Sequence, residues 1–183
     1  IKVNNVRSGY LDTITNNTSF GFRALDPTTT GNSNTAIGFK SLSGNNTGVN
    51  NTAVGASALR LNSTGNGNIA IGKSTLHNSN GLSYNIAIGD SALFNNGIGI
   101  TESYEGIGLT AIGSKALFNN TTGLNNTAIG FQTLLSNTSG FENTANGYQA
   151  LYNNTTGGNN TASGSLALYN NTIACCNTGI GNM

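Results

Sequence analysis

The side chains with the clearest chemical potential lie together near the middle of the chain. Glu102 and Glu105 are two of only six acidic residues, and Tyr104 stands between them. Two carboxylates can serve as the acid and base of glycoside hydrolysis, but two on one loop make a poor pair. A metal ion also needs more oxygen ligands than two glutamates supply. We therefore interpret Glu102, Tyr104 and Glu105 as a candidate ligand or receptor contact, with a tolerated surface insertion as the simpler alternative.

The remaining reactive residues are two cysteines and one histidine. Cys175 and Cys176 are adjacent, and a disulfide between neighbours is strained, whereas thiols of several chains near a symmetry axis can form interchain crosslinks. Free, packed thiols are the simpler interpretation. His77 has no partners with the spacing of a catalytic or metal-binding set. The sequence thus predicts no catalytic residues, no metal site and no cofactor, and the chain is not expected to be an enzyme.

The composition excludes several classes of protein. Of 183 residues, 7% are charged and 36% hydrophobic, against about 25% and about 45–50% in ordinary soluble domains. Asn, Gly and Thr make up close to half of the chain, which is unfavourable for helices, while disordered chains carry more charge and proline. A net charge of +1 offers little attraction to nucleic acid or an anionic membrane.

An internal repeat organises the whole chain. The Gly of Asn-Thr-Ala-Ile-Gly recurs ten times with a seventeen-residue period, and only the interval between Gly89 and Gly113 is longer, by a seven-residue insertion. Positions are numbered here from this Gly: Ala prevails at −2, a branched aliphatic residue at −1, Leu at +4, and Asn at −4 and +7. The repeat glycines and leucines are Gly21, Gly38, Gly55, Gly72, Gly89, Gly113, Gly130, Gly147, Gly164, Gly181, Leu25, Leu42, Leu59, Leu76, Leu93, Leu117, Leu134, Leu151 and Leu168.

This repeat fits one coil of a β-solenoid. A seventeen-residue unit is too short for two packed helices. Thr-Ala-Ile alternates like a strand, and the Asn-Asn-Thr-Thr-Gly stretches have the residues of turns. Stacked Asn side chains can hydrogen-bond from coil to coil, whereas stacked identical charges repel. We predict an all-β chain, a parallel β-solenoid of about ten seventeen-residue coils.

The repeat also suggests where the array begins and how it is stabilised. Residues 1–16 are expected to be a lead-in from a longer chain, and residues 17–183 the repeat array, with the seven-residue insertion within residues 95–109. Neither end resembles a cap, and a core of Ile and Leu alone is thin. We therefore expect a second apolar face, with the Ala positions as its candidate, to pack against identical chains around a symmetry axis.

Aromatic residues follow the same period. They recur at position +1 in Phe22 and Phe39 and again in Phe131 and Tyr148. They recur at position +5 in the pairs Phe94–Phe118 and Tyr152–Tyr169. Residues in adjacent coils at the same position are predicted to stack, which favours a structural role over a sugar-binding platform.

Two stretches carry a resemblance to known repeats. Residues 34–42 read Asn-Thr-Ala-Ile-Gly-Phe-Lys-Ser-Leu, and residues 143–157 repeat this pattern up to Asn-Asn-Thr-Thr-Gly. They look like the head repeats of trimeric autotransporter adhesins, and even more like the Asn-Thr-Ala-x-Gly-x-x-Ala-Leu repeats of phage-type tail-fibre proteins. The resemblance covers about residues 17–181. It implies a left-handed parallel β-roll and a homotrimer, intertwined or side by side, in an extracellular or virion fibre.

The residues and the resemblance together favour a structural segment of a trimeric fibre or adhesin on a cell or virion surface. It would present a binding tip and make lateral contacts. Expected partners are identical chains and a host-surface glycan or protein receptor, without nucleic acid and without membrane insertion in this segment. One alternative is an ice-binding solenoid that uses the Thr ladder at −3, which Ile69 and Ile86 interrupt. A remote alternative is a glycan-degrading tail spike using Glu102 and Glu105.

Overall fold

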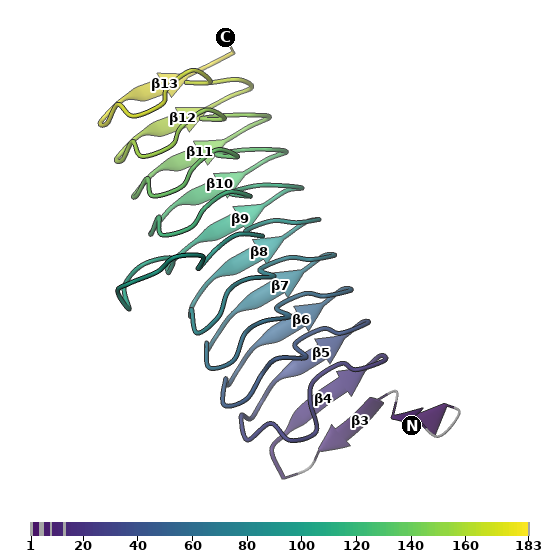
Figure 1. Cartoon of the computed structure of the whole chain (residues 1–183). Coiled ribbons are helices and arrows are strands. Elements are labelled where there is room, and N and C mark those ends of the chain that lie inside the picture. The colour runs from purple at the N-terminus through teal and green to yellow at the C-terminus, as the bar shows by residue number, and fades with distance from the viewer. Residues whose placement is uncertain (1, 4–5, 8, 13, 183) are drawn as a thin grey trace.

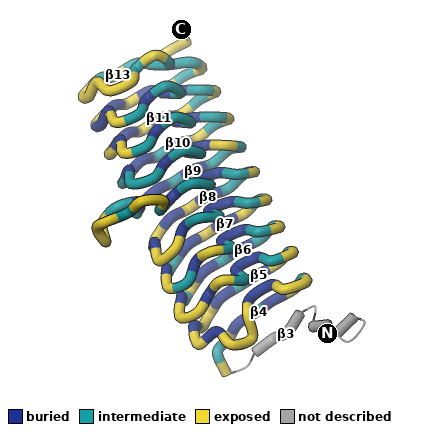
Figure 2. The backbone as a smooth tube through the Cα atoms, viewed as in Figure 1, coloured by how far each residue is buried: buried dark blue, intermediate teal, exposed yellow. Residues whose placement is uncertain are grey.

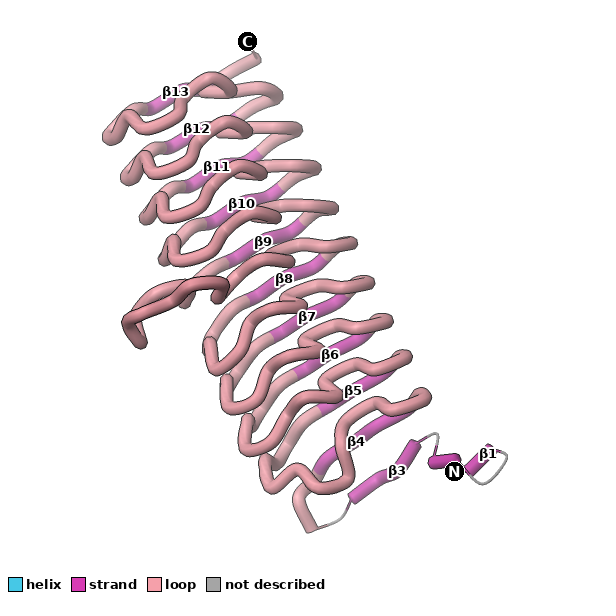
Figure 3. Tube along the Cα trace, viewed as in Figure 1, coloured by secondary structure: helices cyan, strands magenta, loops and turns pink. Residues whose placement is uncertain are grey.

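The chain forms a rod of stacked coils. The computed structural model describes residues 2–3, 6–7, 9–12 and 14–182, which contain strands and turns and no helix (Figures 1 and 3). Each coil contributes one short strand to a common sheet and then returns through irregular backbone. The strands are β1 (Lys2–Val3), β2 (Val6–Arg7), β3 (Gly9–Asp12), β4 (Asn17–Phe20), β5 (Thr35–Ile37), β6 (Thr52–Val54), β7 (Ile69–Ile71), β8 (Ile86–Ile88), β9 (Thr110–Ile112), β10 (Thr127–Ile129), β11 (Thr144–Asn146), β12 (Thr161–Ser163) and β13 (Thr178–Ile180).

The coils stack in the register of the repeat. Strands β4 to β13 follow one another in a single parallel sheet, and equivalent residues pair, as Thr35 does with Thr52. The same register continues from β8 to β9 across the insertion. Outside the strands, the backbone N–H of Leu42 donates to the carbonyl of Ala58 at 2.9 Å. The predicted parallel β-solenoid is therefore confirmed.

The core of each coil is narrow and lies wholly within one chain. It consists mainly of the Ala side chains at −2 and +3 and the Leu side chains at +4, which form one continuous buried cluster. Figure 2 shows buried segments of the backbone recurring from coil to coil along the rod. The Ile side chains at −1 point outward instead, and Ile37 and Ile129 remain 40% and 38% exposed. Two of our expectations are therefore wrong: the Ala positions do not face neighbouring chains, and Ile is not part of the core. Successive residues of a strand point to opposite faces, so burying Ala at −2 exposes both of its neighbours.

The core leucines have an unusual backbone conformation. All the described leucines at +4 lie in the left-handed region, with φ between +45° at Leu25 and +52° at Leu134. This conformation costs an L-residue about 1–2 kcal/mol. Burying a Leu side chain contributes about 1.5–3 kcal/mol, which offsets that cost. The tight return of each coil thus depends on the burial of its leucine.

Two buried columns of Asn connect one coil to the next. At −4, Asn51 Oδ1 accepts from the backbone N–H and the Nδ2 of Asn68, at 3.0 and 3.1 Å. At +7, Asn154 Nδ2 donates to Asn137 Oδ1 at 2.8 Å and to the carbonyl of Gly157 at 3.0 Å. Because each amide bonds both its own coil and a neighbouring one, these columns fix the register. The predicted Asn ladder is confirmed.

Each Asn ladder is broken once, beside the insertion. Ser79 takes the +7 position in the coil before the insertion, and Leu109 takes the −4 position directly after it. Ser79 Oγ and Asn62 Oδ1 are buried and have no hydrogen-bond partner. A serine is too short to bridge the distance that an asparagine amide spans, so the side chains at +7 of these two coils form no hydrogen bond with each other.

The N-terminal edge of the parallel sheet is covered. Strand β3 pairs antiparallel with β4, so that Gly9 lies opposite Phe20 and Asp12 opposite Asn17. This pairing occupies backbone groups that an edge strand leaves open. The expectation that neither end carries a cap is thus wrong for this end, because a short strand of ordinary composition serves without a recognisable motif.

Replacing Ser79 with Asn should repair the +7 ladder. The new amide would donate to Asn62 Oδ1, which is otherwise an unpaired buried acceptor. We expect a stabilisation of about 1–2 kcal/mol, from one restored buried hydrogen bond. The measurement is the shift of the thermal unfolding midpoint. The matched control is Asn137→Ser, which introduces the same defect elsewhere and should destabilise by about 1–3 kcal/mol. If the unfolding midpoint moved in the same direction in both variants, the amide hydrogen bonds at +7 would not stabilise the rod.

The repeat Gly should not accept a side chain. Gly130 has φ +135°, and a Cβ there would collide with the carbonyl of Gly147 in the next coil. Gly99, in the insertion, has φ +77° and open space around it. Gly99→Ala should therefore cost only about 1 kcal/mol in backbone strain, whereas Gly130→Ala should cost about 3 kcal/mol or more. Denaturant unfolding of both variants measures the difference, and a smaller loss for Gly130→Ala would show that close coil stacking is not required there.

Candidate functional site

The insertion forms a loop that projects from the side of the rod between β8 and β9 (Figure 1). Tyr104 is 59% exposed, and Glu102 and Ile98 are also exposed. The structure therefore places two of the three predicted contact residues, Glu102 and Tyr104, at the surface, where a receptor can reach them.

Glu105 has a different role from its neighbours. Its Oε2 accepts hydrogen bonds from the backbone N–H groups of Thr101 at 2.7 Å and Glu102 at 3.2 Å. The carboxylate thus closes its own loop, so that of the two side chains only that of Glu102 remains available to a ligand. This disfavours the alternative in which Glu102 and Glu105 act together on a glycan. Among the described residues, no group of three or more His, Cys, Asp or Glu side chains is placed to hold a metal ion.

The insertion accompanies a departure from the repeat in the preceding coil, at Leu82. Most coils have Gly at +10, where a Cβ meets the next coil, as a Cβ on Gly65 would meet the carbonyl of Leu82. Leu82 occupies this position itself and is buried, with Gly97 and Gly106 of the insertion directly against its side chain. Gly106 then takes the place of the turn glycine, since its carbonyl accepts from Asn96 Nδ2 at 2.9 Å. The extra residues accommodate a leucine that an ordinary coil would exclude.

A second surface feature is the outer sheet face, by which we mean positions −3 and −1 of β4 to β13. Position −3 is mostly Thr, with Ile69 and Ile86 in two coils, and position −1 is mostly Ile or Val. Several of the Ile side chains count among the exposed large hydrophobic residues. These side chains form an apolar row along the outer sheet face, in which Ile37, Ile71 and Ile129 are 40%, 39% and 38% exposed.

The aromatic columns stack as the sequence predicts. At +1, ring centroids are 5.9 Å apart for Phe22–Phe39 and 5.8 Å apart for Phe131–Tyr148. At +5, Tyr152 and Tyr169 stack at 5.1 Å. The remaining stack at +5 is longer than predicted, because the His77 ring joins Phe94 and Phe118, with centroid distances of 5.0 and 5.4 Å. These contacts support the structural interpretation of the columns and account for His77.

The two cysteines lie exposed in the coil that precedes β13, and both are free thiols. A hydrogen bond with the Cys175 thiol, together with its charge, raises the pKa of Cys176. Cys176 therefore keeps its proton to a higher pH than an isolated cysteine does. Their exposure is compatible with interchain crosslinking.

A group of cations near the N-terminal end was not predicted from the sequence. Arg23 and Lys40 both occupy position +2, in adjacent coils, and Arg60 lies one coil further on. The three line a common pocket. The signal was available: two cations exactly one repeat apart lie one above the other in a solenoid, even where the overall net charge is near zero.

Comparisons with known proteins give no further assignment. Within the part of the chain that the structure describes, no helix has the length and hydrophobicity to cross a membrane. Family models, curated proteins and solved structures were all compared with the chain, and none of them matches it.

Proposed function

We propose that the chain is a non-enzymatic structural segment of a homotrimeric fibre or adhesin on a cell or virion surface. In this proposal the rod holds a binding tip away from the surface, and the loop within residues 95–109 makes lateral contacts with a host glycan or protein. Two findings support the proposal: the resemblance of the repeats to those of fibre proteins, and the rod shape of the solenoid.

The observation that carries the proposal is the outer sheet face. Its apolar row at −1 runs through six successive coils, from Ile37 to Ile129, and each of its side chains keeps part of its surface exposed. Identical coils in identical register give each copy the same row at the same spacing, so parallel copies are complementary along the whole rod. The Ala positions are ruled out as the contact, since they lie in the core.

The contact would change character toward the C-terminal end. Position −1 is Asn146 in β11 and Ser163 in β12, in place of the aliphatic residues of the preceding strands. Polar side chains at a symmetry axis can hydrogen-bond with their equivalents in the other chains, and such positions fix register in assemblies. The trimeric number itself rests on the resemblance alone.

Ice binding is a second candidate, which the orientation of the Thr column supports. Thr at −3 stands on the outer sheet face in eight coils, with ladder partners such as Thr127 and Thr144 directly paired. The neighbouring column is aliphatic rather than a second row of Thr. Thermal hysteresis in solution would support this candidate, and freezing without hysteresis would remove it.

The mass of the chain in solution tests the trimer. We expect light scattering after size exclusion to give three times the 18.7 kDa of one chain, because burying the outer sheet face removes its exposed aliphatic surface from water. A stable, soluble monomer at all concentrations would contradict the proposal.

A double variant locates the contact. Ile37→Lys with Ile129→Lys places a charge at two outward-facing positions in distant coils, where water solvates it in a single chain but identical charges of the other chains would face it across the contact. This repulsion, with the loss of about 1 kcal/mol of apolar burial per side chain, should dissociate the assembly while the circular dichroism stays unchanged. The control is Ser74→Lys, at position +2, where Lys40 and Lys115 already stand, and this variant should remain assembled. A trimer that survives the double variant would exclude the outer sheet face as the contact.

A further inference from the structure

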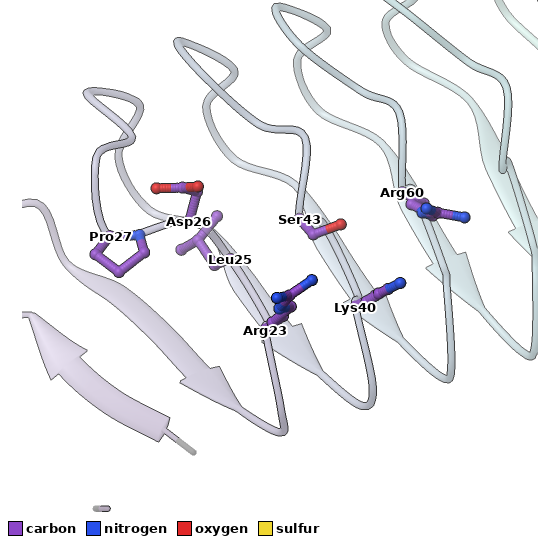
Figure 4. Close-up of a pocket in the computed structure, with 7 residues that line it drawn as sticks. All are labelled: Arg23, Leu25, Asp26, Pro27, Lys40, Ser43 and Arg60. Atoms are coloured by element: carbon purple, nitrogen blue, oxygen red, sulfur yellow. The ribbon is translucent and has the colours of Figure 1, made fainter. Parts of the chain in front are cut away.

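The shaft of the rod carries a second candidate binding site, near its N-terminal end. A pocket of about 370 Å³ opens there across three successive coils. Figure 4 shows the side chains of Arg23, Lys40 and Arg60 along one side of these coils, with Asp26 and Ser43 beside them. Pockets that bind small ligands have volumes of about 300–1,000 Å³, so this one has room for a sugar unit.

The charge of this pocket is concentrated and unpaired. It contains three of the seven Lys and Arg residues of the chain, although the net charge of the whole chain is only +1. Within residues 14–182, none of the three cations forms an ion pair. Because adjacent coils are about 4.8 Å apart, the Arg23 and Lys40 positions repeat at that interval. An anion that enters the pocket therefore meets cations that are not already neutralised.

The one carboxylate that lines the pocket, that of Asp26, is hydrogen-bonded within its own turn. Asp26 Oδ1 accepts from the backbone N–H of Thr28 at 2.8 Å and from its hydroxyl at 2.7 Å. These hydrogen bonds lower the pKa of Asp26, so the group is ionised at neutral pH. Held in this turn, Asp26 does not pair with Arg23, yet it retains oxygen lone pairs that can accept hydrogen bonds from ligand hydroxyl groups.

An aromatic rim adjoins the cations. Phe22 and Phe39 are exposed and nearly parallel, with an angle of 7° between their rings. Arg23 Cζ lies 5.4 Å from the Phe22 centroid, and Lys40 Nζ lies 5.1 Å from the Phe39 centroid. The rings thus hold the two cations at the surface by cation–π contacts and add apolar surface next to the charge.

We propose that this pocket binds an acidic sugar, a saccharide unit that carries a carboxylate or a sulfate group. Arg23, Lys40 and Arg60 would bind the anionic group by charge-assisted hydrogen bonds, while Asp26 and Ser43 would bind hydroxyl groups. The inference goes beyond the proposed function, because it places a binding site on the shaft and does not depend on the number of chains.

The same residues favour a sugar over nucleic acid. Affinity for duplex DNA comes largely from cations that neutralise successive phosphates, whereas this pocket offers three cations together with an ionised Asp26. A carboxylate repels a phosphodiester backbone but serves as an acceptor for a sugar with many hydroxyl groups. Aromatic and apolar surface beside the cations matches the less polar faces of a sugar ring.

Calorimetric titration of the intact chain with four defined probes tests the inference. The probes are a polygalacturonate tetrasaccharide, a heparin tetrasaccharide, neutral maltotetraose and single-stranded decathymidylate. We expect at least one of the two acidic tetrasaccharides to bind about tenfold or more tighter than maltotetraose and decathymidylate. Comparison of polygalacturonate with heparin then distinguishes a carboxylate from a sulfate ligand.

The decisive variant is Arg23→Gln with Lys40→Gln. Gln already occupies position +2 at Gln132 and Gln149, so the coils should fold normally, as a melting curve can verify. Affinity for the acidic tetrasaccharide should fall by about tenfold or more. The matched control is Lys115→Gln, at the same position of a distant coil, which should change affinity by less than about twofold. Equal losses in both variants, no binding of either acidic probe, or tighter binding of decathymidylate would each overturn the inference.

Discussion

Every coil of this protein must lie on a nearly identical coil at close distance, and the rest of the structure follows from this constraint. Each side chain contacts the equivalent side chain of the neighbouring coil, which is usually of the same type. Residue types are therefore favoured if two identical side chains can pack or hydrogen-bond with each other. Asn does so through its amide, as in the contact between Asn154 and Asn137, and Gly does so by leaving space, as at Gly130. Charged residues do not, which explains why only 7% of the chain is charged.

The same constraint determines which residues are inside. Stacking leaves a narrow interior, which Ala at −2 and Leu at +4 fill, and the leucine reaches it through a left-handed backbone. The Ile side chains at −1, which are larger than those of Ala, lie on the outer sheet face. The chain therefore has a complete core of its own and still carries an unpaired aliphatic row, and this combination links the fold to the proposed assembly.

The sequence was sufficient to predict the solenoid, its register, the Asn ladders and the aromatic stacks, because each depends on residues that recur at one spacing. It was insufficient for the direction of side chains in a three-residue strand, since alternation alone does not decide whether Ala36 or Ile37 faces inward. The left-handed conformation of Leu42 was not predictable either, because no local preference of leucine suggests it. The pocket of Arg23 and Lys40 was not predicted because it depends on which residues lie side by side in space, and the total charge of the chain does not show this.

The central claim is that buried Asn amides, bonded both within and between coils, hold the rod in register. Hydrogen exchange of Asn side-chain amides, followed by NMR, tests it most directly. The account predicts slow exchange at Asn120, Asn137 and Asn154, which are fully buried in the +7 ladder, and fast exchange at Asn46 and Asn125, which are exposed. Fast exchange of the buried amides under conditions where the backbone amides of the strands are protected would contradict it.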